Sequence, residues 1–401
     1  MTAPVENWTT DFDHTHPDWA DHAPEIWDEL RGTCPVAHTE RFGRGCWLPT
    51  RHEDVAEIAH DSERFSSREV LVADFLPSIE KGAVDGGAPP ITSDPPFHRG
   101  ARRLLLPAFS PRTIDALEEN TRELCNKLLD EIIDQGPDID AATGYTQHIP
   151  VQVIAHMLGV PPEDGDKFRF FLRQIIETPG AHEQLEYEDS LDGYLDRIID
   201  EHRTEPKDDL IGFLVDAELE GEPLSNDHIR GSVALLLLAG IDTTWSAIGA
   251  SLWHLAQNPA DRARLREEPE LMDSAVEEFL RAYAPVTMAR VVAEDTQLGG
   301  EQLKAGDWLL LPFPAANRDP EAFEDADKVI LDRQVNRHAA FGLGTHRCLG
   351  SNLARMEMRV ALTEWMKRIS DFELLDDPPV RWSTGQIRGP RELPMRILHA
   401  T

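Results

Sequence analysis

The stretch FGLGTHRCLG, residues 341–350, decides how this chain is interpreted. It gathers three glycines, a histidine and an arginine around one cysteine, Cys348, just ahead of a segment with a helical pattern. Glycine adopts backbone conformations that other residues avoid, and it lets another group approach the main chain closely. A helix start offers N–H groups and a partial positive charge, which both favour a thiolate. The stretch therefore predicts that Cys348 is presented as a deprotonated sulfur ligand.

The spacing of this stretch is specific, because it reads F-G-x-G-x-H-x-C-x-G from Phe341 and Gly342 through His346 to Cys348. It resembles the haem-binding signature of the cytochrome P-450 family, the haem-thiolate monooxygenases, at every position that defines the signature. A cysteine thiolate is one of the few axial ligands of haem iron, and its electron density favours O–O bond cleavage. The resemblance implies haem b, iron protoporphyrin IX, with Cys348 as the iron ligand.

The composition excludes several classes of protein. The chain has 401 residues with 41% hydrophobic residues, enough for a substantial core. Its net charge of −34 repels nucleic acid and anionic membranes. The N-terminal segment lacks the basic start and apolar stretch of a signal peptide, and the most apolar run, Val233–Ile241, is too short to span a bilayer. We expect a cytoplasmic monomer without nucleic-acid or membrane partners.

Two explanations of the strong acidity remain open. It provides solubility, or it is an adaptation to high salt, where screening relieves the self-repulsion. The four cysteines, Cys34, Cys46, Cys125 and Cys348, are not spaced as CxxC pairs, so a zinc knuckle or a thioredoxin-like motif has no support.

The organisation along the chain indicates one domain over residues 1–401, since no internal repeat and no Ser/Gly-rich or Pro-rich linker divides it. The pattern is mainly α-helical, with Gly299-Gly300 as the turn of a hairpin among a few short strands. Helices are predicted over or within 24–30, 51–60, 111–134, 150–178, 187–204, 224–257, 260–266, 270–282 and 349–368, and a loop over 82–90. The resemblance implies the mainly helical cytochrome P-450 fold with a small β-rich part.

Glu278 and Arg281 form an ExxR pair on one face of a predicted helix. An isolated pair of this kind is usually a surface ion pair of little consequence. In the family that the chain resembles, the same pair is buried and joins an arginine ahead of the haem loop, which Arg333 matches. The resemblance gives these three residues a structural role in holding the cysteine loop.

Ala239-Gly240-Ile241-Asp242-Thr243-Thr244 interrupts the long apolar helix with polar residues, which need partners when buried. A threonine bonded to the preceding helical turn is one interpretation. The other is catalytic: Gly240 opens the helix towards a ligand, and Asp242 and Thr243 face the cavity. Monooxygenase chemistry needs two protons on the distal side, which an acid and an alcohol can deliver. The motif matches the oxygen-activation AGxDTT of the family.

Basic residues gather at Asp94–Pro111 in an otherwise acidic chain, with His98 and Arg102 on one helix face. Haem carries two propionates that need cationic or hydrogen-bonding partners. By resemblance, His98 and Arg102 reach one propionate side, and Arg290 and His346 reach the other. Four further arginines are then candidates for a docking face for an acidic electron-transfer protein, or they are ordinary surface residues. These are Arg99, Arg103, Arg347 and Arg355.

The C-terminal third looks nearest to the camphor-hydroxylase type of the family. On that basis we expect a mostly apolar pocket for a small hydrophobic substrate. The expected lining residues are Leu71, Leu235, Leu238, Ala239, Val286, Met288, Gln386 and Ile387. Leucine and isoleucine at helical spacing are also ordinary core residues.

The resemblance implies a monooxygenase that inserts one atom of O2 by hydroxylation, O-dealkylation or epoxidation. Electrons are expected from a separate ferredoxin or flavodoxin with its reductase. Two alternatives are a peroxygenase that uses H2O2 and usually lacks the acid–alcohol pair, and a non-catalytic haem-binding protein.

Overall fold

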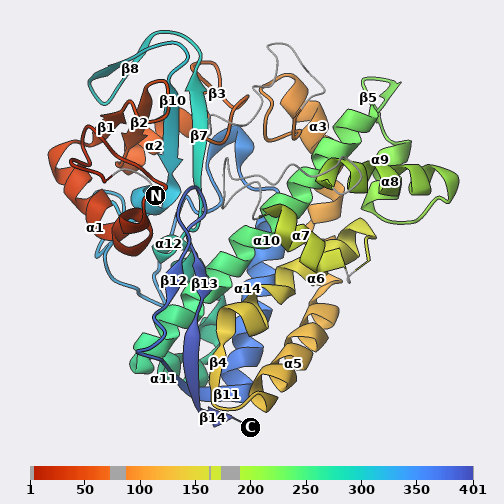
Figure 1. Ribbon diagram of the computed structural model, residues 1–401, viewed down its shortest axis with the longest axis vertical. Coiled ribbons are helices and arrows are strands. Elements are labelled where there is room, and N and C mark those ends of the chain that lie inside the picture. The colour runs from red at the N-terminus through yellow and green to blue at the C-terminus, as the bar shows by residue number, and fades with distance from the viewer. Residues whose placement is uncertain (1–3, 73–86, 162–163, 173–189, 401) are drawn as a thin grey trace.

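The computed structural model describes residues 4–72, 87–161, 164–172 and 190–400, which are mainly helical (Figure 1). The helices are α1 Pro17–Thr33, α2 His52–His60, α3 Phe97–Leu105, α4 Pro111–Asp115, α5 Glu118–Asp134, α6 His148–Leu158, α7 Gly165–Leu172, α8 Leu191–Thr204, α9 Leu210–Asp216, α10 Asn226–Gln257, α11 Pro259–Glu267, α12 Met272–Ala282, α13 Phe313–Ala316 and α14 Ser351–Arg368. The strands are β1 Val36–Thr39, β2 Cys46–Pro49, β3 Phe65–Ser66, β4 Asp138–Asp140, β5 Glu218–Leu219, β6 Glu222–Pro223, β7 Thr287–Val292, β8 Thr296–Leu298, β9 Glu301–Leu303, β10 Trp308–Pro312, β11 Ile369–Leu374, β12 Arg381–Trp382, β13 Pro390–Glu392 and β14 Pro394–Ala400.

The β-rich part is a five-stranded sheet in the order β1-β2-β10-β7-β3, at the upper left of Figure 1. Only the pairing of β10 with β2 is parallel. Trp19 and Trp27 of α1 pack with Leu48 and Leu310 in a small core beside this sheet. Because alternate residues of a strand share a face, β7 brings Met288 and Arg290 to the same side.

The long helix α10 passes diagonally through the helical part of the molecule (Figure 1). Its 32 residues make it about 48 Å long at 1.5 Å per residue. The Ser225 side chain accepts a hydrogen bond from the N–H of His228, and Asn258 ends the helix before Pro259. α10 packs against α6, α8 and α14 and is mostly buried. It is long and apolar enough to cross a membrane by length and composition, yet 67% of its most apolar window is buried inside the protein.

The last helix, α14, begins three residues after Cys348 and packs against α5, α10 and α12. The chain then ends in a sheet in which β14 pairs with β11 and β4 (Figure 1, bottom). In the sequence between β11 and β14, strands β12 and β13 form a hairpin that contacts α10. The segment containing Cys348 is therefore followed directly by a helix anchored in the core.

Most predicted elements are confirmed, including the hairpin turn at Gly299 and Gly300, whose φ angles of 56° and 93° favour glycine. The helix predicted over 111–134 is instead two helices, α4 and α5. The N–H of Leu117 bonds to the carbonyl of Ile114, which tightens the chain between them. Residues 82–86, 173–178 and 187–189 of the predicted elements lie outside the described residues.

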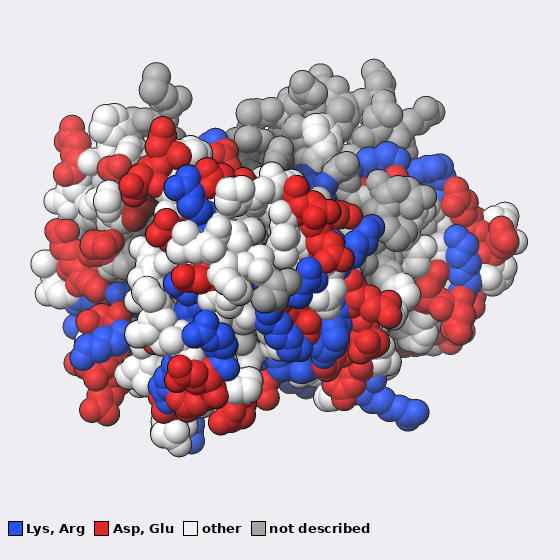
Figure 2. Space-filling model, turned by 90° about the horizontal axis from the view of Figure 1, so that it is seen from below, with Lys and Arg blue, Asp and Glu red and all other residues white. Residues whose placement is uncertain are grey.

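The acidic composition is visible on the surface, where acidic side chains cover large areas of the face shown in Figure 2, with smaller basic groups between them. Some acids are neutralised locally, as in the ion pairs Arg396–Asp138 at 2.6 Å and Arg368–Asp130 at 2.7 Å. The chain has 73 Asp and Glu residues but only 39 Lys and Arg residues, which leaves the net charge of −34.

Candidate active site

The cysteine loop is closed by a backbone hydrogen bond from the N–H of Cys348 to the carbonyl of Phe341, at 2.7 Å. Gly342 and Gly344 have φ angles of 69° and 65°, a region in which other L-residues are strained. A Cβ atom on Gly344 would lie 2.1 Å from the carbonyl oxygen of Ala59 in α2. The glycines therefore shape the loop and let α2 pack against it.

The electrostatic surroundings of Cys348 act in two directions. Desolvation raises the pKa of the thiol, while the Gly350 N–H and the nearby Arg102 and Arg347 oppose the rise. The thiolate state predicted from the sequence stays a prediction, since desolvation opposes it in the protein alone. A metal ion deprotonates a thiol that coordinates it. Although protein atoms surround the sulfur, Cys348 is an exposed residue, so a ligand can reach it.

Glu278 and Arg281 form a completely buried, two-pronged ion pair, with Arg281 Nε to Oε2 at 2.9 Å and Nη2 to Oε1 at 2.8 Å. The remaining Arg281 donors bind the carbonyl oxygens of Asn317, Ala326 and Lys328. All five N–H groups of the guanidinium thus have acceptors, which a buried charge requires. The pair is not the surface ion pair of the alternative interpretation.

Arg333 completes this network through its Nε, 2.9 Å from Glu278 Oε2. Asn336 donates to the same carboxylate at 3.1 Å, so the segment leading into the cysteine loop is tied to α12. The backbone carbonyl of Asn317 accepts a hydrogen bond from Arg281, and its side-chain Oδ1 accepts one from the N–H of Ala339 at 2.6 Å. The structure therefore connects the three predicted residues to the loop by hydrogen bonds.

His98, Arg102, Arg290 and His346, which lie far apart in the sequence, come together beside the cysteine loop. The rings of His98 and His346 are 4.2 Å apart between centroids. Arg102 donates to the carbonyl oxygen of Arg347 at 2.6 Å, which joins α3 to the loop. Both ring nitrogens of His98 and Nε2 of His346 are buried without a hydrogen-bond partner among the described residues.

The cluster of His98, Arg102, Arg290 and His346 is suited to anions. Desolvation and the neighbouring cations lower the pKa of His98 to about 4 and that of His346 to about 2. Desolvation also lowers the pKa of the buried Arg290 to about 10. The charged forms of the two histidines are thus destabilised by burial and by their cationic neighbours, and that of Arg290 by burial, which a bound carboxylate would relieve. The two propionates of haem fit this donor set.

The metal-binding chemistry of the site also fits a porphyrin. Within residues 4–72, 87–161, 164–172 and 190–400, no group of three or more His, Cys, Asp or Glu side chains is arranged to hold a metal ion. Iron protoporphyrin needs only an axial ligand from the protein, which the thiol of Cys348 can supply.

Asp242 and Thr243 lie in different surroundings, contrary to the expectation that both face the cavity. Asp242 is only 2% exposed, and its Oδ1 forms an ion pair with Nη2 of Arg391 at 2.7 Å. Thr243 is half-buried and donates to the carbonyl oxygen of Ala239 at 2.8 Å, the bond to the preceding turn. A Cβ atom on Gly240 would lie 3.3 Å from Cγ1 of Ile154 in α6, so this side of Gly240, expected to face a ligand, faces α6 instead. Helix packing, which the motif alone does not reveal, decides these directions.

The predicted pocket residues lie in two places, one on α10 and one where three other chain segments meet. Leu235, Leu238, Ala239 and Thr243 form an accessible stripe on α10, and Ala239 is exposed although it lies in the middle of the helix. The other residues come from three chain segments that hydrogen-bond to one another. Thr287 N–H binds Gln386 O at 2.8 Å, and Ala289 N–H binds Val70 O at 2.9 Å. These contacts bring together Leu71, Val286, Met288, Gln386 and Ile387.

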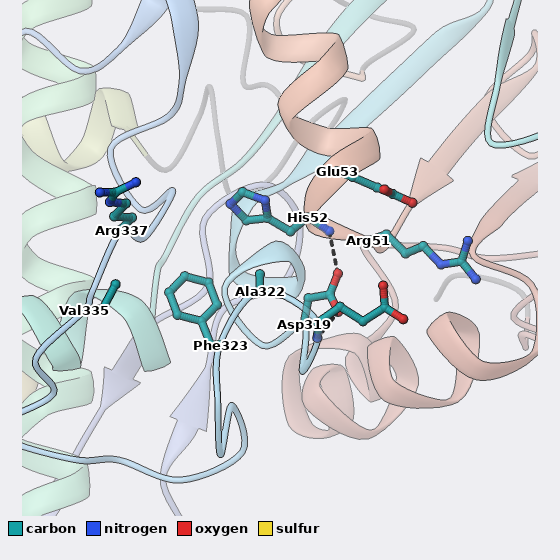
Figure 3. A pocket seen from close by; sticks show the side chains of 9 residues that line it. Arg51, His52, Glu53, Asp319, Ala322, Phe323, Val335 and Arg337 are labelled. Carbon is teal, nitrogen blue, oxygen red and sulfur yellow. Dashed lines mark hydrogen bonds between the residues drawn. The ribbon is translucent and has the colours of Figure 1, made fainter.

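A separate surface pocket of about 370 Å³ lies between the start of α2 and residues 319–337 (Figure 3). The N–H of His52 donates to Asp319 across it at 2.8 Å, and the rings of His52 and Phe323 meet edge to face. Its lining mixes basic residues such as Arg51 with acidic ones. None of the predicted site residues lines it.

Two contacts of the site were not predicted from the sequence. Glu277 binds Arg355 through two hydrogen bonds, so Arg355 is not the spare surface charge that was one interpretation of it. Arg391, the partner of Asp242, lies in a segment without a recognisable motif. The only hint of the Glu277–Arg355 contact was that a second carboxylate, Glu277, stands next to Glu278 in the sequence. Nothing in the spacing indicated the contact between Asp242 and Arg391.

Comparison with known proteins identifies the relatives of this chain. The sequence profile of the cytochrome P-450 family matches residues 164–381. The chain is 36% identical to a mycinamicin IV hydroxylase/epoxidase of Micromonospora griseorubida, over 92% of this chain and 94% of that protein. It is 37% identical to a nocardicin C N-oxygenase of Nocardia uniformis, over 88% and 90% of the two chains.

Among solved structures, CYP109E1 from Bacillus megaterium in complex with testosterone superposes with a TM-score of 0.85. It is 32% identical to this chain and is matched over 96% of this chain and 100% of its own. The similarity therefore extends over nearly the whole length and includes both the helical and the β-rich parts.

Proposed function

The chain belongs to the cytochrome P-450 family of haem-thiolate monooxygenases, and we propose that it inserts one oxygen atom of O2 into a small hydrophobic organic substrate. In hydroxylation, substrate R–H, O2, two electrons and two protons give R–OH and water. O-dealkylation and epoxidation follow from the same chemistry. The observation that carries the proposal is the accessible Cys348, held by the Glu278–Arg281–Arg333 network beside the cluster of His98, Arg102, Arg290 and His346.

The proposed cofactor is haem b, with Cys348 as the ligand of its iron. When bound, the haem supplies the redox centre that activates O2. His98, Arg102, Arg290 and His346 hold its two carboxylates, since buried imidazole nitrogens and guanidinium groups need acceptors. Phe341 and Gly342 shape the loop that presents the sulfur.

Two residues of α10 are proposed to handle protons. Thr243 lies on the accessible stripe, where its hydroxyl can orient water. Asp242, one residue earlier, is the acid that passes protons towards this side. We further propose that residues 1–401 work as one domain. Strand β2 of the first part pairs with β10, α2 packs against the cysteine loop, and α10 packs against α14 near the C-terminal end of the chain.

The proposed substrate is compact and hydrophobic. Relatives are named for mycinamicin IV and nocardicin C, and a solved one binds testosterone, so membership of the family leaves the substrate open. The candidate lining of Leu71, Leu235, Leu238, Ala239, Val286, Met288, Gln386 and Ile387 contains one polar side chain. A lining of this kind favours apolar ligands. The likeness of the C-terminal third to the camphor-hydroxylase type remains a prediction.

The proposed electron donor is a ferredoxin or flavodoxin with its reductase, in the cytoplasm, acting on a monomer. Arg99 and Arg103 of α3 and Arg347 of the cysteine loop are exposed on a surface joined by the Arg102–Arg347 contact. Leu106, 47% exposed, lies at the end of α3 on the same stretch. A basic surface with an apolar residue complements an acidic donor and speeds its association.

The ligand assignment is tested by the absorption spectrum of the reduced protein under carbon monoxide. We expect the red-shifted Soret band of a thiolate ligand, and we expect Cys348→Ser to lose it. Cys34→Ser, which changes a half-buried cysteine elsewhere, is the matched control and keeps the band. A histidine-type spectrum of the unaltered protein would refute the assignment.

The activity is tested by screening small terpenoids, aromatics and fatty acids for the low-to-high spin shift, followed by turnover with a ferredoxin and its reductase. We expect oxidised product with O2 and reductant. Faster turnover with H2O2 would identify a peroxygenase. Ligand spectra without oxidation under any electron donor would identify a non-catalytic haem-binding protein.

A further inference from the structure

The ion pair between Asp242 and Arg391 connects α10 to the C-terminal hairpin. Asp242 Oδ1 lies 2.7 Å from Arg391 Nη2, and the two side chains are only 3% and 14% exposed. Charges so far removed from water are stable only with close partners. The carboxylate of Asp242 is therefore held by a fixed guanidinium and is not surrounded by solvent.

Arg391 is held against α10 by two more contacts. Its Nη1 donates to Ser246 Oγ at 3.0 Å, and its Cζ lies 4.5 Å from the ring centroid of Trp245. Asp242, Trp245 and Ser246 are spaced i, i+3 and i+4, so they share one face of the helix. The guanidinium is thus fitted to this face at three points.

The backbone of the hairpin is packed equally tightly on α10. A Cβ atom on Gly389 would lie 2.2 Å from Cβ of Ser246, and one on Gly249 would lie 2.8 Å from Pro390. Neither residue could carry a side chain without moving the hairpin away. The position of Arg391 relative to Asp242 is therefore set by main-chain packing.

The same hairpin carries two candidate pocket residues, Gln386 and Ile387. Ile387 pairs with Val286 through a β-bridge. Ser383 Oγ donates to the carbonyl of Ile387 at 2.7 Å and accepts from the N–H of Gly389 at 3.1 Å, which closes the turn between the two regions. The pocket wall at Ile387 and the side chain of Arg391 are thus four residues apart on one short, hydrogen-bonded segment.

We propose that Arg391 is the positioning residue of the distal acid: it fixes the Asp242 carboxylate and links it to the pocket wall at Gln386 and Ile387. This inference rests on the proposed monooxygenase function. In coupled turnover, R–H, O2, two electrons and two protons give R–OH and water. When protons are delivered to the wrong place or too late, O2, two electrons and two protons give H2O2 and leave R–H unchanged. The electrons come from the ferredoxin-type or flavodoxin-type donor.

The test compares Arg391→Ala with Asp242→Asn. Both variants are expected to keep the thiolate spectrum and to lose product per electron pair at least 5-fold, with an equivalent gain of H2O2, as an estimate for a lost general acid–base group. The double variant is expected to be no worse than Asp242→Asn alone, because residues that act as a unit are not additive. Arg391→Lys, which keeps a cation, is expected to restore part of the coupling.

Arg381→Ala is the matched control, since it removes an ion pair with Glu392 at 2.6 Å from the same hairpin at a position 70% exposed. It is expected to leave the coupling unchanged. The thermal midpoints of the same variants give a readout independent of turnover, and those of Asp242→Asn and Arg391→Ala should be non-additive. If Arg391→Ala does not fold, Arg391→Gln and Arg391→Lys carry the comparison.

Unaltered coupling in a haem-loaded Arg391 variant, or multiplicative losses in the double variant, would overturn the proposal. Failure of the proposed function is a different result. It would show as the absence of a thiolate spectrum or of any oxidised product in the unaltered protein.

Discussion

The carboxylate of Glu277 and the guanidinium of Arg355 form a two-pronged ion pair between α12 and α14, at 2.5 Å and 2.8 Å. The guanidinium of Arg355 also lies 4.4 Å from the ring centroid of Phe341, and Nε2 of His338 lies 3.2 Å from Glu277. The pair therefore contacts both the segment before Cys348 and the helix after it. It is a second support of the loop, separate from the Glu278 network.

This pair predicts an acid-dependent stability. Desolvation raises the pKa of Glu277, but hydrogen bonds from Arg355 and His338 outweigh it and lower the pKa from 4.5 to about 2. Between pH 4.5 and pH 2 the unfolded chain then binds more protons at this site than the folded protein does. The stabilisation is present above pH 4.5 and lost as the pH falls to about 2. It amounts to about 2 kcal/mol after allowing for partial exposure.

Glu277→Gln should lower the thermal midpoint at pH 7 and flatten its dependence on pH below 4.5. Thermal unfolding between pH 3 and pH 7 measures both. Asp273→Asn, which changes an acid with an 81% exposed side chain on the same helix, is the control. Curves for Glu277→Gln and the unaltered protein that run parallel through this window would contradict the assignment.

Breaking the buried pair of Glu278 and Arg281 should destabilise the protein strongly. In Glu278→Gln, the guanidinium of Arg281 remains buried with 0% exposure and without its counter-charge. The expected loss is about 3–5 kcal/mol in the free energy of unfolding, together with lower haem retention. Urea unfolding and haem content after purification measure the two effects.

Asp332→Asn provides the comparison, because Asp332 pairs with Arg264 at 2.8 Å with side chains 42% and 36% exposed. An exposed pair contributes about 0–1 kcal/mol. Equal losses for Glu278→Gln and Asp332→Asn would show that the buried network does not hold the loop.

Removing the hydroxyl of Thr243 should uncouple the reaction without removing the haem. Thr243→Ala is expected to keep the thiolate spectrum and to divert several times more electrons to H2O2. Ser251→Ala is the control. The Ser251 hydroxyl donates to the carbonyl oxygen of Ala247 in α10, just as the Thr243 hydroxyl donates to that of Ala239. Because Ser251 is buried, its removal is expected to leave the coupling unchanged. H2O2 and product formed per electron pair are measured together. Identical coupling in both variants would remove the assigned role of Thr243.

The excess negative charge predicts a dependence of stability on salt. With a net charge of −34, repulsion among surface carboxylates destabilises the folded protein at low ionic strength. Molar KCl screens this repulsion beyond about 3 Å, so the thermal midpoint should rise. Unfolding scans at low salt and at 1 M KCl measure the shift. A midpoint that does not change would leave solubility as the explanation of the acidity.

Local features of the fold were predictable from the sequence where short-range chemistry sets them. The start of α10 follows from Ser225, because a serine hydroxyl caps the helix that begins directly after it. The end of α10 follows from Pro259. The turn of the β8–β9 hairpin follows from Gly299 and Gly300, which adopt positive φ angles. No capping residue, proline or glycine lies at the break between α4 and α5, so the sequence did not predict that break.

The sequence by itself indicated Cys348 as the candidate thiol ligand and predicted that Glu278 and Arg281 can pair, because both features depend on residues a few positions apart along one segment. That the pair is completely buried is decided by the tertiary structure. Tertiary structure alone decided that Asp242 faces Arg391, that Arg355 is bound by Glu277, and that Gly240 packs on α6. These partners come from elements distant in the sequence. Spacing along a helix fixes which residues share a face, but which face meets which neighbour depends on how the whole core packs.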